Sequence, residues 1–133
     1  MRALVIALVL VGCRPPITVE RLERAEVLVW GVYGQPRASM PTVVAHLQEN
    51  CTDVYGNSGL WHATSRECLP GWYGARVEVL VLTDFASSVL AHEMYHAALA
   101  AMSPTHDGDD AHETAGWSVF VPAAESELRR TGL

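Results

Sequence analysis

The chain has 133 residues, half of them hydrophobic, which is enough apolar material for one domain with a single core. Its formal net charge of −6 argues against a nucleic-acid-binding protein, because such proteins need a basic face. The composition therefore predicts one folded domain that does not bind polyanions.

The N-terminus has the pattern of an export signal. Met1-Arg2 is a short positive start, and the unbroken apolar run Ala3–Val11 leads to Gly12-Cys13. This run is much shorter than the roughly 20 residues of a permanent membrane span, and it has the length of a signal-peptide hydrophobic region. Residues 1–12 are predicted to be a signal peptide.

Leu10-Val11-Gly12-Cys13 resembles the bacterial lipobox. The resemblance implies cleavage before Cys13 and a lipid anchor on that cysteine. Because Arg14 rather than aspartate follows, it also implies residence in the outer membrane, facing the periplasm or the exterior. An ordinary secretory signal with a chance cysteine, or a buried N-terminal strand, is the alternative. Residues 13–24, which include Pro15-Pro16, are predicted to be a tether.

Export changes the interpretation of the two remaining cysteines, Cys51 and Cys68. In an oxidising compartment an even pair predicts a disulfide. A loop of about 17 residues would stabilise the fold by roughly 3 kcal/mol through the unfolded state. A catalytic thiol is a weaker interpretation, because no thiol remains once the pair forms. The spacing is also far from the two to four residues typical of a zinc pair.

The predicted elements alternate between strand and helix over residues 25–133. A β-branched and aromatic stretch predicts a strand at 26–33, and Pro41 begins a predicted helix that leads to Cys51. Glycines and turn formers predict an irregular hairpin region over 52–75. A strong strand follows at 76–83, then a helix at 88–102 with Asp84, Ser87 or Ser88 as the N-cap candidates. An acidic loop at 105–116 and a closing helix at 117–130 complete the chain.

The run His92-Glu93-Met94-Tyr95-His96 carries the strongest chemical signal. On a helix, residues four apart lie one turn apart on the same face, so both imidazoles can reach one zinc ion. Glu93 lies about 100° around the helix, where it can flank the metal and take a proton from zinc-bound water. This is the His-Glu-x-x-His pattern of zinc peptidases. A surface helix with two solvated histidines is the alternative.

A catalytic zinc site needs a third protein ligand and one open position. The candidates are His106, Asp109, Asp110, His112 and Glu113, and the reach of the chain permits either histidine. Asp109 and Asp110 are interpreted as an acidic turn, in which one carboxylate could orient a ligand histidine through its second ring nitrogen.

Taken together, the chain resembles small bacterial lipoproteins that carry a zincin-like motif. The matching features are the lipobox, the two cysteines ahead of a valine-rich strand, Ser88 and Leu90 before His92–Ala97, the loop Gly108-Asp109-Asp110 with His112, and Trp117. The resemblance implies His112 as the third ligand. His106 is our second choice, although an ordinary surface histidine is its favoured interpretation. It implies an α+β, minimal zincin-like domain, in which a small, mostly antiparallel sheet packs on the His-Glu-x-x-His helix and a C-terminal helix.

The leading hypothesis is a membrane-anchored zinc peptidase that hydrolyses peptide bonds with zinc-activated water and Glu93 as general base. The second is a non-catalytic zinc-binding envelope lipoprotein, and the third a small structural lipoprotein without metal. Glu93 discriminates between the first two, since a storage site has no need of a general base beside two histidines. Tyr95, Trp30 and Trp117 are expected to pack in the core.

Overall fold

The computed structural model describes residues 16–47, 71–72, 76–81, 84–103, 105 and 107–133. Along the chain these form α1 (Val19–Val32), a 3₁₀ turn η1 (Arg37–Ser39), β1 (Thr42–Leu47), β2 (Gly71–Trp72), β3 (Arg76–Val81), α2 (Leu90–Met102) and α3 (Trp117–Thr131). The mixture of helices and a sheet agrees with the predicted α+β class. Within the described residues, no helix is both long and apolar enough to cross a membrane.

Helix α1 corrects two predictions. Its N-cap, Thr18, accepts a hydrogen bond from the backbone N–H of Arg21 at 3.2 Å, so residues 19–24 belong to the helix and not to a tether. The predicted strand at 26–33 is wrong as well. Ala25, Glu26, Val29 and Trp30 recur at helical spacing and are all buried, so burial of one helix face overrides the strand propensity of the valines.

The predicted helix after Pro41 is also wrong, because Thr42–Leu47 form the edge strand β1. Strand β3 is central, in the order β1-β3-β2. β1 pairs with β3 in parallel, from Thr42 opposite Arg76 to Leu47 opposite Val81. Among the described strands, the two-residue β2 alone is antiparallel to β3, so the expectation of a mostly antiparallel sheet is wrong. The strand predicted at 76–83 is confirmed over 76–81.

The buried carboxylate of Glu26 ties α1 to β1. One oxygen accepts the N–H of Val43 at 3.1 Å, and the other pairs with Arg37 at 2.8 Å. Both oxygens are therefore satisfied, which is what a carboxylate needs when only 5% of the residue is exposed. The polar link fixes the start of the parallel edge strand.

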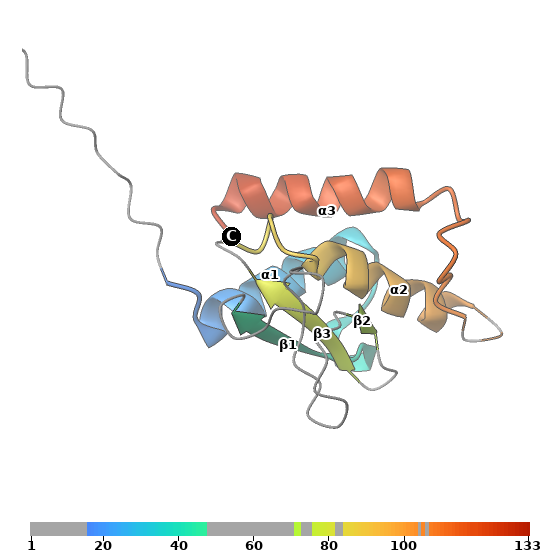
Figure 1. The fold of residues 1–133 in the computed structure, drawn as a ribbon, viewed down its shortest axis with the longest axis horizontal. Helices are drawn as coiled ribbons and strands as arrows, with labels where there is room; N and C mark the ends of the chain where they lie inside the picture. The colour runs from blue at the N-terminus through green and yellow to red at the C-terminus, as the bar shows by residue number, and fades with distance from the viewer. Residues whose placement is uncertain (1–15, 48–70, 73–75, 82–83, 104, 106) are drawn as a thin grey trace, which may run out of the picture.

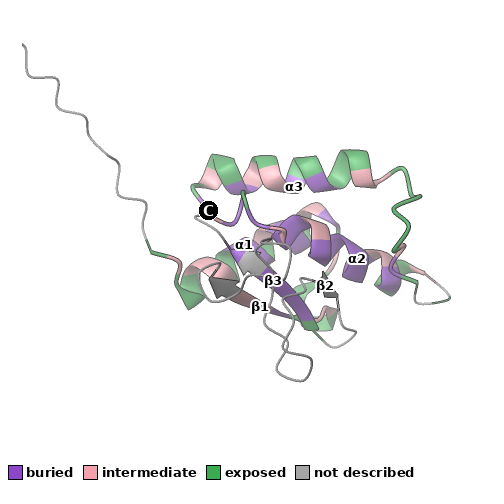
Figure 2. Ribbon diagram, in the orientation of Figure 1, coloured by how far each residue is buried: buried purple, intermediate pink, exposed green. Residues whose placement is uncertain are grey.

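Helices α2 and α3 confirm the two helices predicted in the C-terminal half. α2 packs on β3, and α3 contacts α1 and α2 on the side away from the sheet (Figure 1). Alternate valines of β3, Val77, Val79 and Val81, are fully buried and join α1 and α2 in one core. α2 is buried along most of its length, whereas the outer face of α3 is exposed (Figure 2). The histidine-bearing helix is thus held between the sheet and α3.

Candidate metal centre

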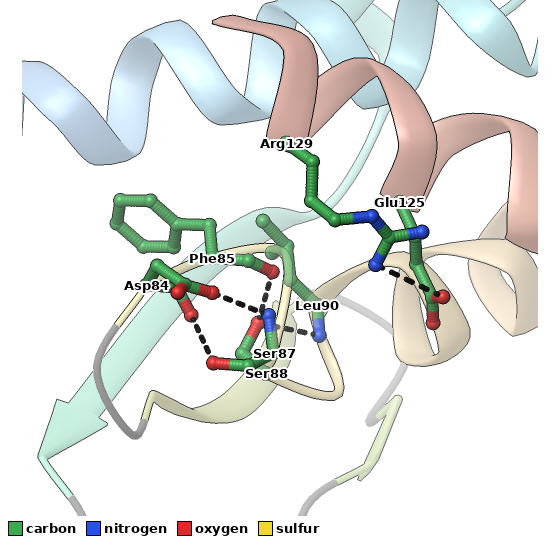
Figure 3. Close-up of polar contacts among 7 residues, drawn as sticks. All are labelled: Asp84, Phe85, Ser87, Ser88, Leu90, Glu125 and Arg129. Atoms are coloured by element: carbon green, nitrogen blue, oxygen red, sulfur yellow. Dashed lines mark hydrogen bonds and ion pairs between the residues drawn. The ribbon is translucent and has the colours of Figure 1, made fainter. Parts of the chain in front are cut away.

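A hydrogen-bonded turn sets the start of α2 just ahead of the histidines (Figure 3). Asp84 accepts the N–H of Ser87 at 2.6 Å. The hydroxyl of Ser88 donates to the carbonyl of Phe85 at 2.8 Å and accepts the N–H of Leu90 at 3.0 Å. Val89 occupies the N-cap position itself, so the three predicted N-cap candidates build the preceding turn instead. The turn fixes where the first helical residue lies, two positions before His92.

Residues next to the two histidines, Ala91 and Tyr95, anchor α2 to its neighbours. The hydroxyl of Tyr33 donates to the carbonyl of Ala91 at 2.6 Å within the core. Tyr95 is 3% exposed, as expected of a packing residue, and its ring lies 5.0 Å from that of Tyr33. With this face held inside, the positions about 100° around the helix, His92 and His96, meet the loop that follows α2. Their ring centroids lie 5.1 Å apart.

The loop after α2 brings His112 to the same place. Its Nε2 lies 3.2 Å from Nε2 of His96, and its ring centroid lies 4.9 Å from that of His92. One ligand atom from each of the three histidines falls within 4.8 Å of the others. His92, His96 and His112 are called the histidine triad below. His96 is buried, His92 half-buried and His112 exposed, so the triad opens to solvent on the His112 side.

A backbone carbonyl selects the tautomer of His96. Nδ1 of His96 lies 2.7 Å from the carbonyl oxygen of Gly108, which can only accept a hydrogen bond. Nδ1 therefore carries the hydrogen, and the Nε2 lone pair is free to face the triad. The sequence interpretation gave this orienting role to an aspartate. In the structure the backbone of Gly108 performs it, one residue before Asp109.

The donor set fits a zinc ion. Two nitrogens bound to a tetrahedral zinc at 2.0–2.1 Å lie about 3.3–3.4 Å apart, close to the 3.2 Å between His96 and His112. Neutral imidazoles are the ligands that zinc prefers, and burial lowers the pKa of His92 to about 4, helped by the two neighbouring histidines. Three histidines also leave a fourth position open, as in catalytic zinc sites.

Glu93 follows His92 on α2, and only 8% of the residue is exposed. Burial raises the pKa of its carboxyl group to about 7, and the negative charge of Asp110 raises it further. Asp110 lies on the loop that carries the third histidine, two residues before it. A carboxyl group with a pKa near 7 can exchange a proton near neutral pH.

Trp117 has a role that the sequence interpretation missed. Its ring centroid lies 4.9 Å from His92, 4.5 Å from His96 and 4.4 Å from His112, so the indole contacts the whole triad instead of only filling the core. The signal available in the sequence was a tryptophan five positions after His112, at the first residue of a helix.

Gly116 permits the approach of α3 to α2. A Cβ atom at this position would overlap the hydroxyl of Tyr95 and lie 3.0 Å from the ring of Phe120. Trp117 follows directly, and its ring packs edge-on against Tyr95 at 4.8 Å. The absence of a side chain at Gly116 therefore lets the indole reach the triad.

Other predicted site residues fall outside the described part of the chain. These are Cys13, the cysteine pair Cys51 and Cys68, and His106, the second choice for third ligand. Among the remaining candidates, the carboxylate of Asp109 makes hydrogen bonds within its own loop, and Glu113 is exposed.

No protein-family model, curated protein or solved structure matches this chain. The function is therefore inferred from the geometry and chemistry of the site.

Proposed function

We propose that this protein is a zinc-dependent peptidase of the bacterial cell envelope, held to the membrane, in our interpretation the outer membrane, by a lipid on Cys13. The observation that carries the proposal is the convergence of ligand atoms from three imidazoles within 4.8 Å, two of them on the helix that also carries the buried Glu93. His92, His96 and His112 would hold the metal. A non-catalytic metal site would need the three ligands but would have no use for Glu93.

Each residue has a distinct role in this proposal. Zinc, when bound, would lower the pKa of a bound water to about 7 and polarise a peptide carbonyl. Glu93 accepts a proton at its carboxylate and returns it to the leaving amine. The hydrogen bond from His96 to Gly108 holds one ligand ring in orientation. The exposure of His112 gives a substrate access to the triad from solvent.

Metal analysis and cleavage assays on matched variants test this proposal. Purified wild type is expected to carry one zinc per chain and to cleave members of a mixed peptide library. His92→Ala should lose both properties. Glu93→Gln should retain zinc but cleave at least about 100-fold more slowly, as expected when a general base is removed. Glu113→Gln makes the same change of charge on an exposed loop residue and should behave as wild type.

The outcomes separate the candidate functions. Wild type that binds no zinc would refute the metal site. Zinc binding without cleavage, unchanged in Glu93→Gln, would favour the non-catalytic zinc-binding lipoprotein. The anchor is tested independently by feeding cells a labelled fatty acid. Label is expected on the wild type and absent from Cys13→Ala, and label that survives this substitution would contradict lipidation at Cys13.

A further inference from the structure

The carboxylate of Asp109 is the centre of the loop that carries His112. One oxygen accepts the backbone N–H of Glu113 at 2.9 Å. The other accepts the backbone N–H of Thr114 at 2.8 Å and the indole N–H of Trp117 at 2.7 Å. Together these hydrogen bonds hold the pKa of the Asp109 carboxyl well below its usual range, and the bond from the Thr114 backbone has the largest effect. The carboxylate is therefore an ionised acceptor engaged by the protein, not a spare metal ligand.

The backbone of this loop is strained at the two residues that matter. Asp109 has φ 57° and His112 has φ 56°, both in the left-handed region that side-chain-bearing residues rarely adopt. The N–H of His112 donates to the carbonyl of Asp109 at 2.9 Å, which closes the turn between them. A left-handed conformation costs about 1–2 kcal/mol per residue and persists only where surrounding bonds fix it.

Little else fixes His112. Its side chain is exposed, so close packing does not hold it on every side. Its described side-chain contacts are with His96, His92 and the indole of Trp117. That indole in turn donates a hydrogen bond to Asp109. Asp109 thus restrains both the backbone of the third histidine and the ring on which it rests.

We propose that Asp109 is a positioning residue for metal binding, which holds His112 and Trp117 where the third imidazole meets the other two. This inference rests on the proposed metal site. It predicts that Asp109 acts on metal affinity through His112 and does not contact the metal.

Asp109→Asn is the appropriate substitution. Asparagine has the same size and, like aspartate, tolerates the left-handed conformation. Its amide nitrogen cannot accept a hydrogen bond, so at least one bond of the loop is lost. Glu113→Gln is the matched control, since it removes one negative charge from the same loop at an exposed side chain.

The measurement is the dissociation constant for zinc, by competition with a chromophoric chelator, in single and double variants. Asp109→Asn is expected to weaken binding about 10- to 100-fold, the range found when a residue that orients a ligand is changed. Glu113→Gln should stay within about twofold of wild type. In a His112→Ala background, Asp109→Asn should cause no further loss, because its effect passes through the missing imidazole.

Three results would overturn the inference. They are unchanged zinc affinity in Asp109→Asn, an equal loss in the presence and absence of His112, and an equal loss in Glu113→Gln. Wild type that binds no zinc would instead refute the proposed function, and the inference with it. Should Asp109→Asn not fold, Trp117→Phe keeps a ring but removes one bond to Asp109. Because the indole also contacts His92 and His96, this substitution should weaken zinc binding more with His112 present than in a His112→Ala background, and an equal loss in both would overturn the inference.

Discussion

The buried carboxyl of Glu93 should make the stability of the metal-free protein depend on pH. Burial raises its pKa to about 7 from an ordinary 4.5. Below pH 4.5 the group is protonated in both the folded and the unfolded chain. As the pH rises from 4.5 to about 7, the unfolded chain ionises this group while the folded protein still holds it protonated, so stability that is present at low pH is lost by the time the pH passes the folded pKa.

Glu93→Gln keeps the shape of the side chain and removes this ionisation. The difference between the unfolded pKa of 4.5 and the folded pKa of about 7, at 1.36 kcal/mol per pKa unit, corresponds to about 3 kcal/mol of unfolding free energy. The variant should therefore match wild type near pH 4 and be more stable by about 2–3 kcal/mol at pH 8. The free energy of unfolding is measured by urea titration with circular dichroism, in the presence of a chelator.

Glu113→Gln provides the control, since the Glu113 side chain is exposed. The stability difference between this variant and wild type should be the same at pH 4 and pH 8. A difference between Glu93→Gln and wild type that is the same at pH 4 and pH 8 would contradict the reasoning. Added zinc should reduce the difference at pH 8, because a nearby cation favours the ionised carboxylate.

Three further predictions test how the site is supported. Gly116→Ala should destabilise the protein by about 1–3 kcal/mol in urea titration, because its methyl group overlaps the Tyr95 hydroxyl. Gly31→Ala is the control: its methyl group, in α1, meets no atom within 4 Å and should stabilise the protein by up to about 1 kcal/mol. Equal effects of the two substitutions would contradict the steric argument. At saturating Cu²⁺, tryptophan fluorescence should be quenched in wild type and much less in Trp117→Phe, as this indole contacts all three imidazoles; equal quenching in both would refute that placement. Ser88→Ala removes a buried hydroxyl that makes two hydrogen bonds and should lower the unfolding free energy by about 1–3 kcal/mol, whereas no loss would show that the turn does not set the start of α2.

Local patterns predicted the C-terminal half of the fold well. The alternating valines of β3, the helix that carries His92 and His96, and the closing helix α3 all lie where the sequence places them. Each has a periodic apolar face and a clear terminator, such as Gly132, whose φ of 76° ends α3 in the left-handed conformation. Elements of this kind are specified by residues close together in the chain.

The N-terminal half was predicted less well because strand propensity and helical period conflict there. The stretch 26–33 is rich in valine and aromatic residues, yet Ala25, Val29 and Trp30 form the buried face of a helix. In β1, Val43 and its neighbours pair in parallel with a strand more than 30 residues later, and the sequence shows no sign of that partner. Parallel pairing depends on tertiary contacts, which a local pattern does not contain.

The candidate site shows the same contrast between features set by nearby residues and features set by tertiary contacts. Two of the proposed ligands, His92 and His96, follow from helix geometry alone, since residues four apart share a face. The third depends on a loop with two left-handed side-chain-bearing residues, held by an aspartate whose three acceptor bonds cannot be read from spacing. The resemblance favoured His112, but the roles of Asp109 and Trp117 required the structure.

Tyr95 links these two parts of the site. It occupies a non-ligand position of the His-Glu-x-x-His run, points into the core, and packs on both Tyr33 and Trp117. Its hydroxyl fills the space that a side chain at Gly116 would need. The helix that carries two histidines therefore also determines, through its core-facing side, where α3 begins. Because Trp117 begins α3 and donates to Asp109, the position of the third histidine depends on the packing of this tyrosine.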